Sequence, residues 1–117
     1  MPAFVAWVRA LPGAPVFAAH PVALDGAWLD HYLQRFTPER LFEGPWRPDR
    51  LFRHAPFCLM AFAAGRTGWD FTRCDVGRYP PDWLGHHEHS HRAIDDARGY
   101  ASLLATLMAA PAAAPAR

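Results

Sequence analysis

A short, unbroken run of apolar residues occupies positions 15–19 and lies between two pairs of turn-forming residues. Pro12-Gly13 precede the run, and His20-Pro21 follow it. A run of this length without alternating polar residues is typical of a strand that is covered on both faces, as in the parallel sheets of α/β proteins. We therefore expect residues 15–19 to form a fully buried strand.

Helical patterns flank this expected strand. Residues 3–11 place apolar groups on most of a short helix that ends at Pro12. After the strand, apolar residues recur every three or four positions, which predicts an amphipathic helix with Asp25 near its start. The apolar face of this helix is expected to contain Leu24, Trp28, Tyr32, Leu33 and Phe36.

The second half of the chain contains one ambiguous and one clear element. Residues 57–64 are apolar and could form a strand or a helix, whereas the Gly- and Pro-rich residues 65–85 should be irregular. A final helix is predicted over residues 92–109, followed by a disordered Ala/Pro tail at 110–117. The apolar stripe expected on this helix consists of Ile94, Ala97, Ala101, Leu104 and Met108.

The order helix, strand, helix, apolar segment, helix predicts an α/β fold in which helices pack on a sheet. A chain of 117 residues suffices for one domain, which we place at 1–109. The net charge of +1 gives no general attraction to nucleic acid or to membranes, although the segment 40–78 is mildly basic and could contact phosphate. With two cysteines, no signal peptide and no bilayer-spanning run, we expect a cytoplasmic protein that has no membrane partner.

The sequence from His86 to His91 allows two interpretations as a metal site. His87-Glu88-His89-Ser90-His91 matches the His-Glu-x-x-His pattern of zinc proteases, which needs a helix and a third ligand. No Asp, Glu, His or Cys follows Asp96, and Pro80, Pro81 and Gly85 indicate a loop. The zinc-protease interpretation is therefore disfavoured, and His86, His87 and His89 are expected in a solvated loop that binds metal weakly.

The second interpretation begins at His91 and is that of a nuclease. His91-Arg92-Ala93-Ile94-Asp95-Asp96-Ala97 resembles the last motif of the DEDDh 3′–5′ exonucleases, which is often written H-x-A-[LI]-x-D-A. The segment from His20 to Asp25 resembles the family's middle motif, H-N-x-x-F-D, with Pro21 in place of Asn and Leu24 in place of Phe. The group includes oligoribonuclease, ribonuclease T and small bacterial exoribonucleases.

The resemblance implies a ribonuclease-H-like fold and a hydrolase that uses two Mg²⁺ or Mn²⁺ ions on single-stranded nucleic acid, with RNA favoured. In this family pattern Asp25 and Asp96 are metal ligands and His91 is the general base. Each residue also has a purely structural interpretation. Asp25 could be a helix N-cap, Asp96 could complement a helix dipole, and His91 could be an ordinary surface histidine.

The family's first motif, Asp-x-Glu, does not occur in the sequence. We therefore expect an N-terminally truncated exonuclease fold with helices on a reduced sheet, and activity of this chain alone is an open question. The alternative is a catalytically inactive remnant that binds nucleic acid or protein through exposed aromatics and Arg47, Arg50 and Arg53. An unpaired edge along residues 15–19 would favour a homo-oligomer.

Overall fold

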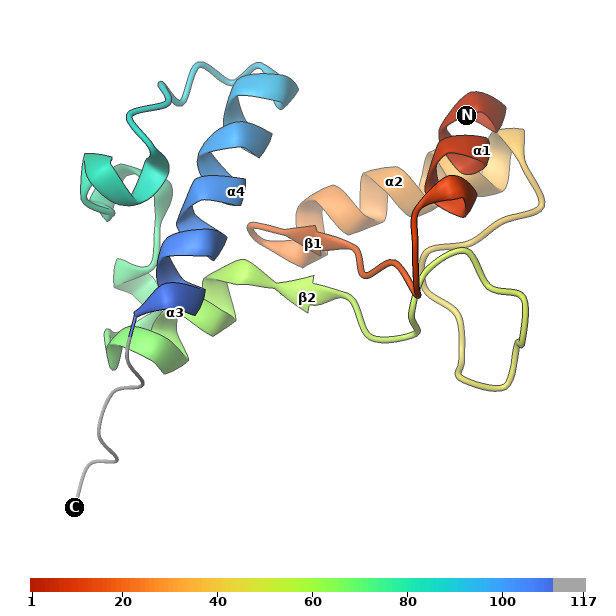
Figure 1. Ribbon diagram of the computed structural model, residues 1–117, viewed down its shortest axis with the longest axis horizontal. Coiled ribbons are helices and arrows are strands. Elements are labelled where there is room, and N and C mark those ends of the chain that lie inside the picture. The colour runs from red at the N-terminus through yellow and green to blue at the C-terminus, as the bar shows by residue number, and fades with distance from the viewer. Residues whose placement is uncertain (111–117) are drawn as a thin grey trace. The chain divides into compact units, whose positions relative to one another are not determined.

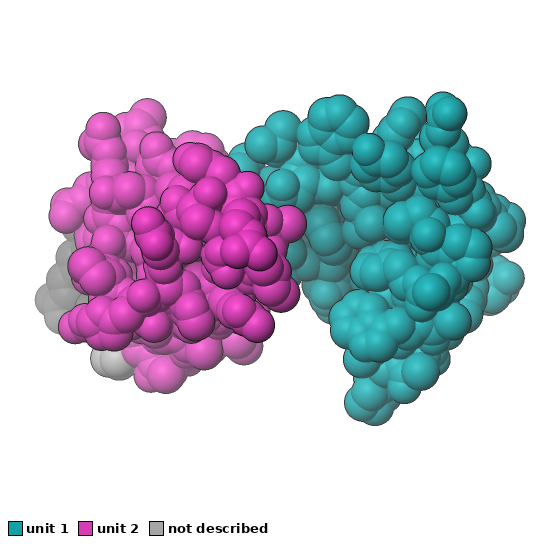
Figure 2. Space-filling model, turned by 90° about the horizontal axis from the view of Figure 1, so that it is seen from above, with its two compact units in different colours: residues 1–58 teal, residues 59–117 magenta. Residues whose placement is uncertain are grey.

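The computed structural model describes residues 1–110 and divides into two compact units, Met1–Cys58 and Leu59–Arg117, which Figure 2 colours separately. The described residues form an α/β fold with four α-helices and a two-stranded parallel sheet. Each unit is described by itself below. Of the tail expected at 110–117, only Ala110 belongs to the described residues.

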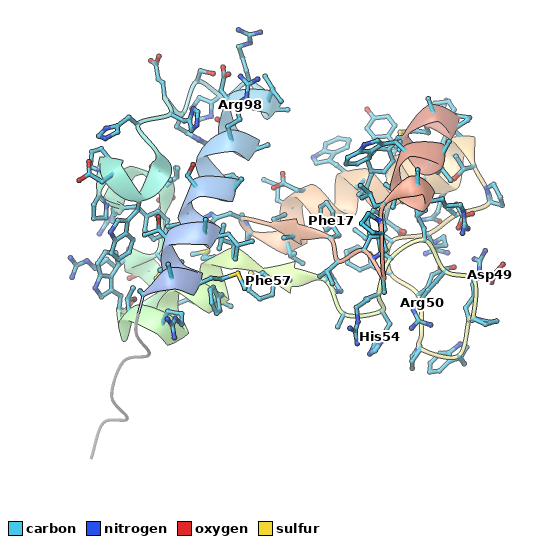
Figure 3. The ribbon with its side chains drawn as sticks, viewed as in Figure 1. Phe17, Asp49, Arg50, His54, Phe57 and Arg98 are labelled. Carbon is cyan, nitrogen blue, oxygen red and sulfur yellow. The ribbon has the colours of Figure 1, made fainter. Side chains whose placement is uncertain are left out.

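Unit 1 contains two helices and both strands (Figure 1): α1 (Pro2–Ala10), β1 (Ala18–Ala19), α2 (Val22–Phe36) and β2 (Phe57–Cys58). The strands are parallel, with Ala18 opposite Phe57 and Ala19 opposite Cys58. The amide of Phe57 in β2 donates to the carbonyl of Phe17, the residue before β1, over 2.7 Å, and Figure 3 labels both side chains. The expected helices near 3–11 and 24–36 and the parallel pairing of the first strand are confirmed.

The prediction of a fully buried strand over 15–19 is wrong in two respects. The strand covers only Ala18–Ala19, and burial alternates along the segment. Ala19 is buried, whereas Val16 is 48% exposed. The reason is that helices and loops cover one face of this small sheet, so residues of odd and even number have different surroundings.

The core of unit 1 joins α1, α2 and the long loop between α2 and β2. Its buried members are Val8, Leu33, Leu41, Leu51 and Phe52. Partly buried side chains close its edges, and the ring of Phe52 lies 6.1 Å from that of Phe17 and 6.4 Å from that of Phe4. Burial of these apolar groups is the main favourable contribution to the stability of the unit.

The predicted apolar face of α2 is also wrong, because only Leu33 of the five residues is buried. The buried row of α2 is Gly26, Asp30 and Leu33. The loop after α2 approaches this row closely, and a β-carbon at position 26 would lie 2.9 Å from Cζ of Phe42. The remaining four residues of the predicted face are exposed: Leu24, Trp28, Tyr32 and Phe36.

The side chain of Asp30, in α2, holds the loop that follows this helix. Its Oδ1 accepts a 2.7 Å hydrogen bond from the amide of Leu41 and a 3.4 Å bond from the amide of Phe42. Its Oδ2 accepts a 2.6 Å bond from Gln34 and forms a 3.4 Å ion pair with Arg40. Burial acts to raise the pKa of Asp30, but the hydrogen bonds and the positive charge outweigh it, so the pKa is lowered.

Unit 2 begins with α3 (Leu59–Thr67) and ends with α4 (Ala93–Ala109). The apolar segment 57–64 therefore forms both the strand β2 and the first part of the helix α3. The expected irregular region 65–85 contains three short 3₁₀ turns: η1 (Phe71–Arg73), η2 (Val76–Arg78) and η3 (Pro81–Leu84). Stacked rings stabilise it, since Trp69 lies 5.5 Å from Trp83 and 6.2 Å from Tyr79, with the Arg73 guanidinium 4.0 Å above Trp69.

The final helix is confirmed, but its predicted apolar stripe is not the buried one. The buried row of α4 is Gly99, Leu103 and Leu107, whereas Ile94 is 52% exposed and Met108 is 69% exposed. A β-carbon at position 99 would lie 3.8–4.0 Å from atoms of Leu84 and His87, so the glycine face meets η3 and the following loop. Because α4 is rich in alanine, apolar residues occur on several of its faces, and periodicity alone does not select one.

Among the described helices, none combines the length and the apolar character that crossing a bilayer requires.

We predict that Asp30→Ala lowers the free energy of unfolding by about 1–3 kcal/mol at pH 7, because it leaves the buried Leu41 amide without an acceptor. A carboxylate with a lowered pKa contributes stability above its unfolded pKa of about 4, and that contribution is lost as the pH falls through the lowered value. The difference in free energy of unfolding between Asp30→Ala and the wild type should therefore be smaller at pH 3 than at pH 7. Urea unfolding at both pH values measures it. Asp49→Ala, at an exposed carboxylate, is the control and should change stability by less than about 0.5 kcal/mol.

Substitution of two glycines of unit 2 by alanine should change the stability of the protein in opposite directions. Gly99→Ala should stabilise the protein by about 0.5–1 kcal/mol, since the new methyl group meets only ordinary contacts within a helix. Gly85→Ala should destabilise it by at least about 1 kcal/mol, because φ is +61° and the β-carbon would lie 2.6 Å from Oγ of Ser102. Thermal unfolding of both variants tests the pair, and equal signs would contradict this account of α4 packing.

Candidate functional site

The candidate site lies in unit 2, where the loop of residues 86–92 leads into α4. The loop begins after Gly85, which ends η3 in the left-handed conformation. His86 and His91 also have positive φ values, 56° and 60°, which are uncommon for residues with a side chain. The chain therefore turns sharply at both ends of a short histidine-rich segment.

A serine attaches this loop to the first turn of α4. Oγ of Ser90 donates a 2.7 Å hydrogen bond to Oδ2 of Asp95 and accepts a 3.3 Å bond from the amide of Arg92. Arg92 is the N-cap residue and its side chain caps no amide. Asp95 thus has a structural role: it holds Ser90 in place, and Ser90 lies between His89 and His91.

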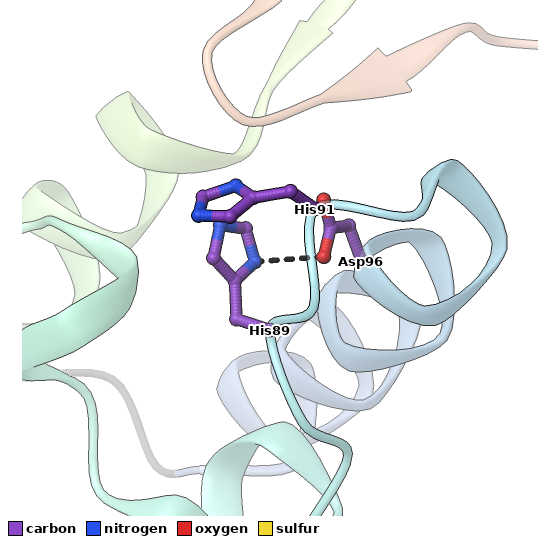
Figure 4. Close-up of side chains that lie close together, drawn as sticks. All are labelled: His89, His91 and Asp96. Carbon is purple, nitrogen blue, oxygen red and sulfur yellow. Dashed lines mark ion pairs between the residues drawn. The ribbon is translucent and has the colours of Figure 1, made fainter.

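His89, His91 and Asp96 come together at the start of α4 (Figure 4). One ligand atom from each residue lies within 4.8 Å of the others. Nδ1 of His89 is 2.9 Å from Oδ1 of Asp96, and the rings of His89 and His91 are 4.6 Å apart at an angle of 73°. The side chains of His89 and Asp96 are 27% and 20% exposed, while His91 is open to solvent.

The helix orientation explains why Asp96 is at this place. Asp96, Gly99, Leu103 and Leu107 follow one another at spacings of three and four, so they share one face of α4. Because that face is buried, Asp96 is directed to the loop. The stripe predicted from the sequence would have turned a different face inward.

The contact between His89 and Asp96 is ionic only when the imidazole carries a proton. Oδ1 of Asp96 is buried but accepts no hydrogen bond, in spite of the 2.9 Å approach of Nδ1. A buried carboxylate oxygen without a hydrogen bond is energetically unfavourable unless another positive group compensates for the lost water. The cluster therefore offers an unsatisfied acceptor beside two imidazoles.

The donor set of this cluster limits which metal it suits. Mg²⁺ binds almost entirely through oxygen, whereas imidazole nitrogen suits transition ions. The cluster has two imidazoles and one carboxylate, so by itself it does not fit the pair of Mg²⁺ ions that the exonuclease resemblance implies. It fits a single transition-metal ion better.

Asp25 belongs to unit 1. It lies in the first turn of α2, which begins soon after β1, and its side chain is at the surface. The N-cap of α2 is Pro21, so the interpretation of Asp25 as the N-cap is wrong. The expected placement of Asp25 after a strand and at the beginning of a helix is confirmed.

The other histidines of the loop, His86 and His87, do not belong to the cluster of His89, His91 and Asp96. His86 pairs with Asp82 at 3.1 Å, and both side chains are exposed. Residues 87–91 are not helical, so His87 and His91 lack the helical spacing that a zinc-protease motif needs. From the sequence, His89 is expected with these loop residues, because no spacing rule links it to Asp96. The two turns of the loop bring His89 and Asp96 together.

Basic residues of unit 1 mostly make internal contacts. Arg47 pairs with Glu39, Glu43 and Asp49, and Arg50 donates to backbone carbonyls at positions 45 and 47. A pocket of about 250 Å³ lies beside them. It is lined by residues that include Val8, Arg9, Arg50, Leu51, Phe52 and Arg53. Figure 3 shows Asp49 and Arg50 in this loop. Arg47 and Arg50 thus serve loop structure.

Comparisons of this chain with protein-family models, with curated proteins and with solved structures found no match.

Proposed function

We propose that the chain carries the middle and last motifs of a DEDDh-type 3′–5′ exonuclease with a ribonuclease-H-like fold, acting on single-stranded nucleic acid and preferentially on RNA. The observation that supports this best is the meeting of His91 and Asp96 at the start of α4. Four residues lie between them, as in the last motif of the family. Asp25, at the start of α2, occupies the corresponding place of the middle motif.

In this proposal His91 is the general base. Its imidazole is exposed at the end of a loop, where it can reach a water molecule, and an ordinary imidazole accepts a proton near neutral pH. The deprotonated water oxygen forms the new bond to phosphorus, while the bond to the 3′ oxygen of the preceding nucleotide breaks. The terminal nucleotide leaves as a 5′-monophosphate.

Asp25 and Asp96 are the proposed acidic ligands for Mg²⁺ or Mn²⁺. The sequence contains no Asp-x-Glu motif, so the proposal assigns only the middle and last motifs to these residues.

The alternative, a non-catalytic binding module, is favoured by the exposed face of α2. Trp28 stacks on Tyr32 at 6.3 Å, Tyr32 stacks on Phe36 at 6.2 Å, and the Arg35 guanidinium lies 5.6 Å from the Phe36 ring. Exposed aromatic rings with a nearby cation are typical of surfaces that stack nucleic-acid bases. In the described residues β1 has one strand neighbour, and association of copies through its other edge is part of this alternative.

The exonuclease proposal predicts that the protein shortens 3′-labelled single-stranded RNA in the presence of Mn²⁺. His91→Ala and Asp96→Asn should each lower the rate by at least about 100-fold, because they remove the base and an acidic ligand. Asp25→Asn should have an effect of similar size.

His86→Ala and Asp82→Asn are matched controls for the cleavage assay. His86 shares the left-handed backbone of His91, and the pair of His86 with Asp82 resembles that of His89 with Asp96 but is fully exposed. Both controls should keep the wild-type rate. Equal rates in His91→Ala, Asp96→Asn and the wild type, or no cleavage by any of them, would contradict the proposal.

The alternative predicts binding of labelled single-stranded RNA without cleavage. Trp28→Ala with Tyr32→Ala should weaken the affinity by at least about tenfold, since stacking contributes roughly 1–3 kcal/mol per base. Leu24→Ala, on the same exposed face but without a ring, should have little effect. Fluorescence anisotropy measures the affinity for the labelled RNA. An unchanged RNA affinity of the double variant would exclude the aromatic face of α2 as the binding surface.

A further inference from the structure

We propose that His89, His91 and Asp96 bind one transition-metal ion of the zinc class, such as Zn²⁺, Co²⁺ or Ni²⁺. This site shares His91 and Asp96 with the proposed exonuclease site and differs from it by its second imidazole, His89, which has no part in that reaction. It also does not involve Asp25. The site rests on the contacts of unit 2 alone (Figure 4).

The spacing of the donor atoms fits such an ion. Bonds from zinc to histidine nitrogen and carboxylate oxygen are about 2.0–2.2 Å long, so two donors of a tetrahedral zinc site are roughly 3.4 Å apart. Nδ1 of His89 and Oδ1 of Asp96 are 2.9 Å apart, so a small side-chain rotation would bring them to the tetrahedral spacing. The ligand atom of His91 lies within 4.8 Å of both, and its exposed side chain can approach further by rotation.

The state of Asp96 is a second, independent indication of a cation. Its Oδ1 is buried and accepts no hydrogen bond from the described residues. A metal ion at this position would give Oδ1 of Asp96 a positive partner when His89 is neutral, and would also accept the lone pair of His89. The close approach of two donor atoms would then be a shared coordination contact.

The loop is held so that the donors stay together without the ion. The Ser90–Asp95 hydrogen bond fixes the residue between the two histidines, and the ring of His89 lies 6.1 Å from that of Tyr100 on α4. Such supporting contacts reduce the ordering that binding requires. Three protein ligands leave room for water on the ion, as in open transition-metal sites.

The full chain should bind one Zn²⁺ per molecule in isothermal titration calorimetry at pH 7.5 without RNA, and Co²⁺ should give visible absorption bands. His89→Ala should weaken Zn²⁺ binding by at least about 100-fold. His86→Ala, in the same loop, should leave it within twofold of the wild type. Circular dichroism of each variant verifies that the fold is retained.

Two variants separate this site from the proposed exonuclease. Asp25→Asn should abolish RNA cleavage and leave Zn²⁺ affinity unchanged, whereas His89→Ala should lose Zn²⁺ binding and keep cleavage in Mn²⁺. Equal Zn²⁺ affinity in His89→Ala and the wild type, or no Zn²⁺ binding by the folded wild type, would overturn the metal-site proposal. Either result leaves the test of the exonuclease unaffected.

Discussion

Burial of a glycine-bearing face beneath a neighbouring segment sets the orientation of both long helices. Gly26 in α2 lies under Leu41 and Phe42, and Gly99 in α4 lies under Leu84 and His87. In each case the helix buries the face on which a neighbouring segment can approach the backbone, although that face is not the richest in large apolar groups. Several large apolar side chains, such as Trp28 and Met108, consequently point to the surface.

This choice of face determines the candidate site. Asp96 shares its face with Gly99, so burying the glycine also brings the carboxylate to the histidine loop. In α2 the same principle places Asp30 inward, where it accepts the amides of the following loop and makes an acidic residue part of the core. One carboxylate therefore organises unit 1, and another gives unit 2 its chemically distinctive group.

The sequence was sufficient to predict the helices α1, α2 and α4 and the place of the first strand in a parallel sheet, because local spacing and turn residues indicate them. It left residues 57–64 open between a strand and a helix, and they contain parts of both. The buried faces of α2 and α4 could not be predicted, since they depend on contacts with segments distant in the sequence. His91 and Asp96 could be identified from a motif of fixed spacing. His89 could not, because its position depends on left-handed turns at His86 and His91 that favour glycine and have no signature in a histidine-rich loop.

The shared face of α4 links the candidate site mechanically to the core. Leu103 is seven residues beyond Asp96, which is about 10 Å along the helix axis at 1.5 Å per residue. A change in the volume beneath Leu103 or Leu107 that makes the helix roll about its axis would swing the carboxylate away from the imidazoles while leaving the loop untouched. Because α4 is rigid, a packing defect near its C-terminal end would change the position of Asp96 at its N-terminal end.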